Sequence, residues 1–219
     1  MHIAARVISI ALHPLLMLTY MLVMLLLVNP YSFGVHSIAD QQARVLLARV
    51  FLSSFFIPAI AVLMLHFTGL LRSLEMPDKE DRIGPYIITG VFYLWLFRNF
   101  LDNSQIPAVF VSFTLGATIA LFLAFFINIF SKISIHALGM GGLVGVTVLI
   151  MAVFPGYGFL SMDGGRQIDI RIVLITGILL SGITGTARLY LRAHEPIDLW
   201  GGYLIGFAAQ FIAARFILT

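Results

Sequence analysis

Long apolar stretches constrain the fold of this chain more than any other feature of its sequence. The hydrocarbon core of a bilayer is about 30 Å thick, so a helix that spans it needs about 20 mostly apolar residues. Seven stretches approach or exceed that length, at residues 7–28, 46–71, 86–101, 106–130, 137–155, 171–187 and 199–217. The third is the shortest, and it contains Trp95 and two tyrosines, which are typical of a membrane interface.

The composition excludes an ordinary soluble domain. Hydrophobic residues make up 60% of the chain, charged residues only 11%, and the mean hydropathy is +1.03. Lipid offers no hydrogen-bond partners to the backbone, so the apolar stretches are expected to be helices. The sequence lacks the alternating pattern of a membrane β-barrel. We therefore predict an all-α fold, a polytopic integral membrane helical bundle of six to seven transmembrane helices, as a single domain over residues 1–219.

Three further features narrow the class of protein. The first apolar stretch lacks a small-residue cleavage site, so it is expected to be a retained span and not a signal peptide. The chain has no cysteine, which excludes disulfides and cysteine-bound metals. A net charge of +3 is too small to predict a nucleic-acid partner. The glycines of 139–145, with Gly202 and Gly206, are expected to let helices pack closely.

The polar connectors alternate between the two faces of the predicted bundle. Three of them, at 72–85, 131–136 and 188–198, fall on the face that carries the N-terminus, because two spans separate each from the next. Both lysines of the chain, Lys79 and Lys132, lie on this face. Parity therefore predicts that these three segments meet.

The segment 188–198 is a polar island between two apolar spans. It contains Arg188, His194 and Asp198 in the spacing Arg-x5-His-x3-Asp. Charged groups at the end of a span are costly unless they pair or take part in function. Residues four apart share a face of a helical turn, so we expect the Asp198 carboxylate to fix one ring nitrogen of His194. A neutral imidazole held this way can attack phosphorus.

The other two segments supply groups suited to the rest of a phosphoryl transfer. That reaction depends on positioning and on stabilising negative charge, which arginine and lysine do well. A second histidine can protonate the leaving oxygen and later activate water. We expect His136 to be this acid and base. The expected phosphate ligands are Arg188, Ser134, Arg82, Lys79 and Lys132.

This set of residues resembles the type 2 phosphatidic acid phosphatase superfamily, which shares its site with vanadium haloperoxidases. The family's third motif, Ser-Arg-x5-His-x3-Asp, is matched with Ala187 in place of serine. Its second motif, Pro-Ser-Gly-His, is matched as Ser134-Ile135-His136, with isoleucines replacing proline and glycine. Its first motif, Lys-x6-Arg-Pro, is matched only loosely by Lys79 and Arg82, which are three apart, and leaves open which of them contacts phosphate.

The resemblance implies an integral membrane lipid phosphatase with a motif core at about 72–206. It implies His194 as nucleophile, a phosphohistidine intermediate and no metal or other cofactor. The expected substrate is a lipid phosphate or diphosphate such as phosphatidic acid, phosphatidylglycerol phosphate or a polyprenyl diphosphate. The sequence does not predict an oligomeric state.

Several other interpretations remain open from sequence. The same fold would serve a headgroup phosphotransferase, or a catalytically degenerate protein that binds lipids or scaffolds partners. His194 and Asp198 would also suit a structural pair or, with His136, a metal site. Lys132 and Arg192 suit interfacial anchors. His13 has no polar partner at a meaningful spacing in the sequence, so no role is predicted for it. The acidic residues of 75–81 are expected to form a solvated, locally paired loop.

The orientation follows from the distribution of basic residues. Seven lie on the first face and six on the second. If four of the seven on the first face bind phosphate, the second face carries more of the basic residues that determine topology. The positive-inside rule then puts the site outside the cytoplasm. For a bacterial inner membrane protein, this is the periplasmic side.

Overall fold

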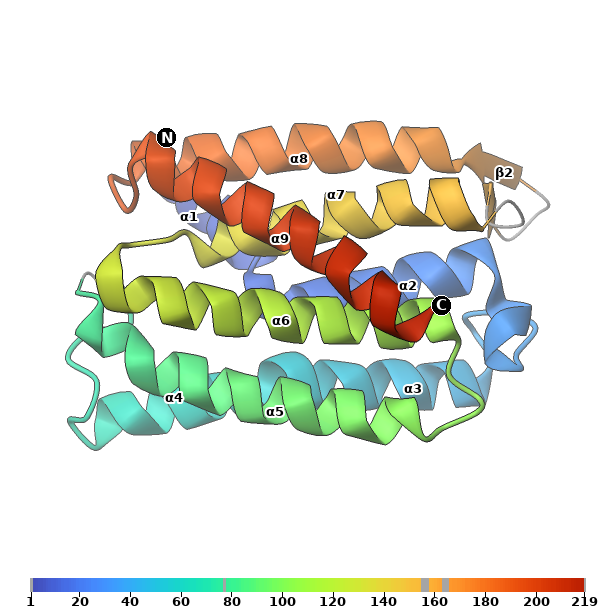
Figure 1. Ribbon diagram of the computed structural model, residues 1–219, viewed down its shortest axis with the longest axis horizontal. Coiled ribbons are helices and arrows are strands. Elements are labelled where there is room, and N and C mark those ends of the chain that lie inside the picture. The colour runs from blue at the N-terminus through green and yellow to red at the C-terminus, as the bar shows by residue number, and fades with distance from the viewer. Residues whose placement is uncertain (1, 77, 155–157, 163–165, 219) are drawn as a thin grey trace.

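Nearly all of the chain is helical, as predicted. The computed structural model describes residues 2–76, 78–154, 158–162 and 166–218. The longer helices are α1 (His2–Ala11), α2 (Met17–Val28), α3 (Gln41–Phe51), α4 (Ile57–Phe67), α5 (Ile83–Leu101), α6 (Ala108–Phe130), α7 (Ile135–Val153), α8 (Ile170–Tyr190) and α9 (Pro196–Ile217). They run side by side as an antiparallel bundle (Figure 1).

Six helical segments are long and apolar enough to cross a membrane. Two of them combine shorter helices, and these six segments are 2–28, 41–67, 108–130, 135–153, 170–190 and 196–217. The predicted membrane-type bundle is confirmed. The seventh predicted stretch, α5, is not among the six, because Arg98 and Asn99 lower its hydropathy. It nevertheless runs from one end of the bundle to the other beside α6 (Figure 1).

Two of the spans are interrupted, and each interruption has a local cause. The first bends between α1 and α2, where Pro14 begins the short 3-10 helix η1 (Pro14–Leu16), since proline has no N–H to continue a helix. The second passes through a π-helical turn, η3 (Leu52–Phe56), just before Pro58. Hydropathy alone predicted each span as unbroken.

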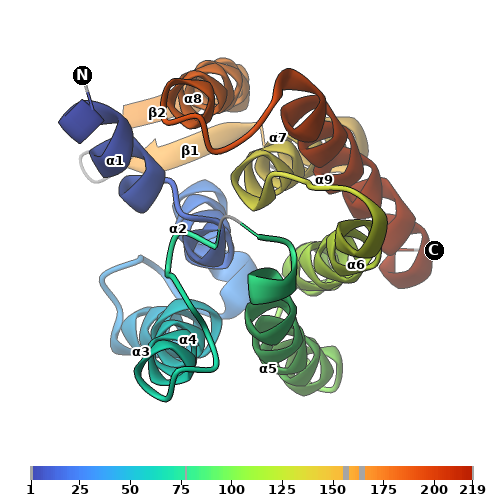
Figure 2. The ribbon, with the colours of Figure 1, turned by 90° about the vertical axis from the view of Figure 1, so that its left-hand side faces the viewer.

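Short elements close the two ends of the bundle. The 3-10 helices η2 (Pro30–Phe33) and η4 (Glu80–Arg82) lead into α3 and α5, respectively. A β-hairpin of β1 (Phe159–Met162) and β2 (Arg166–Asp169) joins α7 to α8, with Phe159 opposite Asp169 in antiparallel register. The connections α4–α5, α6–α7 and α8–α9 lie at the end that carries the N-terminus (Figures 1 and 2). The predicted parity of the three polar segments is therefore correct.

Helices α7 and α9 pack backbone against backbone along their length. A Cβ added to Gly202 would lie 2.6 Å from the Ser134 carbonyl oxygen, and one added to Gly206 would overlap the Leu138 carbonyl oxygen. From the other side, Gly141 faces the Tyr203 backbone just as closely. The expectation that these glycines permit close helix packing is confirmed.

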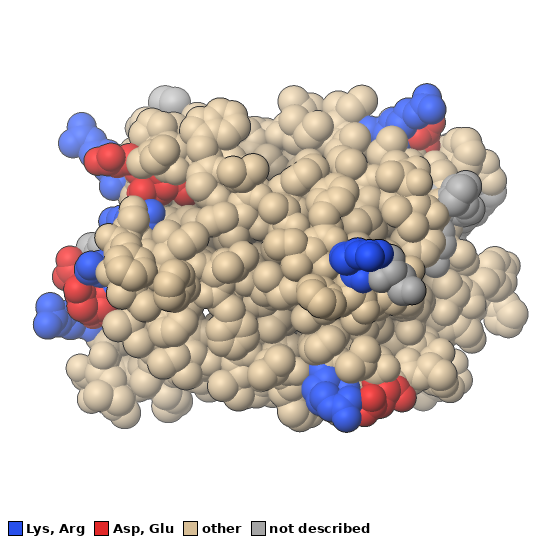
Figure 3. Space-filling view, in the orientation of Figure 1, with Lys and Arg blue, Asp and Glu red and all other residues tan. Residues whose placement is uncertain are grey.

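Charged side chains are few on the face drawn in Figure 3. Acidic and basic side chains gather at the end that carries the N-terminus, and a wide uncharged band separates them from the charges nearer the other end. Large apolar side chains of the spanning helices are exposed, including Phe122, Ile129 and Leu204. This distribution fits a protein surrounded by lipid.

Candidate active site at the helix ends

His194 and Asp198 meet where α8 turns back into α9. The His194 Nδ1 atom lies 3.2 Å from the Asp198 Oδ2 atom, and both side chains are buried. The same carboxylate oxygen accepts a hydrogen bond from the Glu195 backbone N–H at 3.1 Å, as in a capping box. The predicted contact is present, but its expected cause was wrong. His194 precedes the N-cap of α9, so the start of the helix brings the pair together, not a shared helical face.

The surroundings of His194 set the protonation state of its imidazole, and the contact with Asp198 sets its tautomer. Burial and the positive charges of Arg82 and Arg188 lower the pKa of His194 to about 4, while Asp198 opposes them. The ring is therefore neutral at physiological pH. With its Nδ1–H donated to Asp198, the Nε2 atom carries the lone pair, which is the state that a nucleophile needs.

Two arginines bring positive charge to His194 from different segments. Arg188 lies in the last turn of α8 and Arg82 ends η4, and both are half-buried. Their charges act on each other and on His194. Within the described part of the chain neither forms an ion pair, and the buried Nε of Arg188 has no hydrogen-bond partner. This end of the bundle thus holds cationic donors in excess of anionic acceptors.

Arg82 also ties two of the converging segments together. Its Nε and one terminal nitrogen donate to the Met76 carbonyl oxygen, each at 3.1 Å, and the other terminal nitrogen donates to the Ile133 carbonyl oxygen at 3.3 Å. A guanidinium has five N–H groups, so two remain for a ligand. Burial lowers the pKa of Arg82, with Tyr86 and Asp198 opposing.

Ser134 and His136 begin α7 beside this pair. Ser134 is the N-cap of α7, with its Oγ accepting from the Ala137 N–H at 3.4 Å, and its own N–H donates to the Asp198 carbonyl oxygen at 3.2 Å. The His136 Nε2 lies 3.0 Å from the Ser9 carbonyl oxygen, so Nε2 carries a proton. The buried Nδ1 of His136 has no partner among the described residues. That nitrogen is the one available for proton transfer.

His13 is a third histidine here, and sequence reasoning missed it. Its ring centroid lies 5.4 Å from that of His136 in an edge-to-face arrangement, and the Arg188 charge acts on both rings. Its Nδ1 accepts from the Leu15 N–H at 3.3 Å, ahead of the Pro14 bend. Because His13 lies within an apolar span, far from the other motifs in sequence, no spacing pattern indicates it.

The two lysines are placed differently from the arginines. The Lys79 ammonium donates to the Ile129 carbonyl oxygen at 2.9 Å, which satisfies a free carbonyl at the end of α6. The Asn128 side chain returns a hydrogen bond to the Lys79 carbonyl oxygen. Lys132 is half-buried in the α6–α7 connection and makes no hydrogen bond or ion pair with other described residues. No contact links either lysine to His194 in the part of the chain that the structure describes.

The acidic loop at 75–81 only partly matches its predicted character. Glu75 is exposed and pairs with Arg6 of α1 at 3.7 Å, so its partner is not local. Asp81 is buried, with one carboxylate oxygen lacking a partner among the described residues. The expectation of a fully solvated loop was therefore wrong for Asp81. Among the described residues, no group of three or more His, Asp or Glu side chains is arranged to hold a metal ion.

Comparison with known proteins adds no family assignment. No protein-family model matches the chain, and no curated protein and no solved structure matches it either.

Proposed function

We propose that this chain is an integral membrane phosphatase that hydrolyses a lipid phosphate or diphosphate, as the resemblance to the type 2 phosphatidic acid phosphatases implies. The observation that carries the proposal is the environment of His194. Its Nδ1 is held by Asp198 at 3.2 Å, and two half-buried arginines without ion-pair partners in the described chain act on its ring. A phosphate would supply the missing negative charge, and arginine is well suited to bind it.

The proposed reaction has two steps. First, the His194 Nε2 atom attacks phosphorus, a P–N bond forms, and the P–O bond to the lipid breaks as the leaving oxygen takes the Nδ1 proton of His136, which must enter this step as the doubly protonated imidazolium. Second, water attacks the phosphohistidine, His136 removes a proton from that water, and the P–N bond breaks to release phosphate. Arg188 and Arg82 would stabilise the charge on the equatorial oxygens.

The location of the site favours a lipid substrate. It lies where the spanning helices reach one end of the bundle (Figure 2), and α9 beside it exposes the apolar side chains of Ile197, Trp200 and Leu204. Figure 3 shows a wide surface without charge next to this end. A headgroup would meet the arginines there while its acyl chains stay in lipid. If the basic residues that bind phosphate are set aside, the opposite face of the bundle carries more basic residues. By the positive-inside rule, we propose that this end faces the outside of a bacterial cell membrane.

Phosphate release tests this proposal. Detergent-purified protein is incubated with a panel of lipid phosphates and diphosphates in the presence of EDTA. We expect release from wild type, inhibition by vanadate, and loss of release in His194→Ala. His36→Ala is the matched control, because His36 is exposed at the other end of the bundle. Equal turnover in wild type and His194→Ala would contradict the proposal.

A protein that binds lipid phosphates without turnover is the second candidate. The observation that favours it is the use of Arg82 and Lys79 as donors to backbone carbonyl oxygens. Binding of lipid phosphates to wild type, weakened by Arg188→Gln and accompanied by no phosphate release, would identify this case. A phosphotransferase is distinguished by product formation that requires an acceptor lipid.

A further inference from the structure

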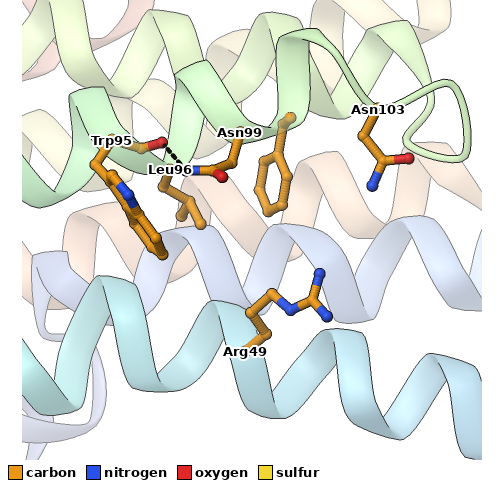
Figure 4. Close-up of a pocket in the computed structure, with 6 residues that line it drawn as sticks. Arg49, Trp95, Leu96, Asn99 and Asn103 are labelled. Atoms are coloured by element: carbon orange, nitrogen blue, oxygen red, sulfur yellow. Dashed lines mark hydrogen bonds between the residues drawn. The ribbon is translucent and has the colours of Figure 1, made fainter.

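A polar cavity lies toward the end of the bundle opposite His194. It has a volume of about 280 Å³ and is lined by Arg49 of α3 and by Trp95, Leu96, Asn99, Phe100 and Asn103 of α5 and the residues after it. The guanidinium of Arg49 points across the gap toward α5, and the amide nitrogen of Asn103 points into the same gap (Figure 4).

The free polar groups of this cavity include several donors. Asn103 uses its Oδ1 to accept the Gln105 N–H at 3.0 Å, which leaves its Nδ2 to donate. Asn99 uses its Nδ2 on the Trp95 carbonyl oxygen at 2.7 Å (Figure 4). Arg49 makes no hydrogen bond or ion pair with other described residues. Arg49, which is exposed, and the Asn103 amide therefore both offer free N–H donors at the lining of this cavity.

Among the residues that the structure describes, no carboxylate lines this cavity. The nearby Asp102 is held by Arg98 at 2.6 Å, one turn earlier on α5, so it does not neutralise Arg49. A cationic space with free donors and no carboxylate selects an anion. Its volume is below the roughly 300 Å³ of typical ligand pockets, so it suits a headgroup and not a whole lipid.

The surroundings of the cavity are those of a membrane interface. Trp95 is 52% exposed on the bundle surface, and indoles concentrate at the headgroup level of bilayers. Leu96 and Phe100 form its apolar wall. Helix α5 packs against η3 and α4, whereas α3 and α5 leave this opening between them near the end of α5. The two helices also expose apolar side chains, including Val45 on α3 and Leu101 on α5.

We propose that this cavity binds the phosphodiester headgroup of an anionic membrane lipid. Arg49 and the Asn103 amide hold the phosphate, and the acyl chains follow the apolar surface of α3 and α5. This site is separate from the one at His194, and its ligand is not a substrate for phosphomonoester hydrolysis. It would fix the depth and tilt of α3 and α5 in the bilayer.

Lipid retention tests the inference. Protein in nanodiscs of equal phosphatidylglycerol and phosphatidylcholine is extracted into mild detergent, and the retained lipids are counted by native mass spectrometry. We expect wild type to retain phosphatidylglycerol preferentially and Arg49→Gln to lose that preference about tenfold. Arg44→Gln is the matched control, since Arg44 is exposed on the same helix but does not line the cavity.

A second variant keeps the test independent of Arg49. Asn103→Asp keeps the oxygen that accepts the Gln105 N–H but replaces the free donor with negative charge, so it should also abolish the preference. Equal retention of the two lipids by wild type would overturn the proposal. So would an unchanged preference in both variants, or displacement of phosphatidylglycerol by inorganic phosphate, which would indicate a site for soluble anions.

Discussion

The Asp198 Oδ2 atom lies 3.2 Å from the His194 Nδ1 atom while it also accepts the Glu195 N–H at 3.1 Å. One carboxylate oxygen therefore begins α9 and orients the imidazole. Asparagine in place of Asp198 separates the two roles, because an amide oxygen can still cap the helix but carries no negative charge to stabilise positive charge on the imidazole.

For Asp198→Asn we expect turnover to fall by about 10²–10⁴-fold, whereas stability should fall by only about 1 kcal/mol. Phosphate release and thermal unfolding measure the two effects. Glu195→Gln, an exposed change in the same connection, is the control and should retain activity. Full turnover in Asp198→Asn would remove the orienting role from this carboxylate.

The pH dependence of stability should report on His194. Burial and two arginines lower its folded-state pKa to about 4, below the unfolded value of 6.5. Between these values the unfolded chain binds more protons than the folded one, so the His194 contribution is complete above about pH 6.5 and is lost as the pH falls toward 4. The thermal midpoint of wild type should fall more steeply over this window than that of His194→Gln. Parallel curves would show that this histidine does not couple to folding.

Arg188→Gln should weaken phosphate binding more than Arg188→Lys, because lysine keeps the charge but not the planar fork of donors. We expect a clear loss of turnover in the first and partial recovery in the second, measured as kcat/KM for the best lipid phosphate. Arg192→Gln, which changes an exposed arginine just after α8, is the control. If Arg188→Gln and Arg192→Gln lost turnover equally while Arg188→Lys kept it, the net charge of this end of the bundle, and not the position of Arg188, would be responsible.

Arg192 offers a test of local backbone strain. Its φ angle is +51°, and the hydrogen bonds Arg192 N–H to Leu189 O and Ala193 N–H to Arg188 O form a Schellman motif, where glycine is usual. Arg192→Gly should therefore stabilise the protein by about 0.5–1 kcal/mol with turnover unchanged. Thermal unfolding checks this, and a lower midpoint would show that the Arg192 side chain contributes more than the strain costs.

Adding a methyl group to the α7–α9 contact should be destabilising. In Gly206→Ala the new Cβ would overlap the Leu138 carbonyl oxygen, so we expect a loss of about 1–3 kcal/mol or more. Gly182→Ala is the matched control, because nothing lies within 4 Å of the added atom, and it should be neutral or stabilising. Unfolding in a denaturing detergent measures both. Equal stability would mean that the two helices separate at little cost.

Apolar length and connector parity were sufficient to predict the bundle and the shared end of its polar segments. They did not predict the bends at Pro14 and at η3, because hydropathy averages over a span and does not register one missing N–H or one extra residue in a turn. They also left α5 uncertain. Its path follows from the connections at its two ends, whereas Arg98 and Asn99 obscure its apolar character.

The sequence predicted the site residues that lie together in one connection. It predicted less well those residues whose contacts are made with a segment distant in sequence. Spacing alone indicated His194 and Asp198, although a capping box and not a helical face brings them together. Lys79 satisfies a carbonyl of α6, and His13 lies beside His136 because of the Pro14 bend. Neither follows from local pattern, since each depends on where another element ends.

The glycine contact between α7 and α9 has a consequence for how this protein responds to its membrane. Ser134 and His136 begin one helix, Asp198 begins the other, and Gly202 holds the two main chains together just below them. Main-chain contact leaves no side chain to repack, so the spacing of these groups is set by the backbone. A thicker or thinner bilayer would be accommodated by tilting helices outside this contact, while the spacing of Ser134, His136 and Asp198 stays constant.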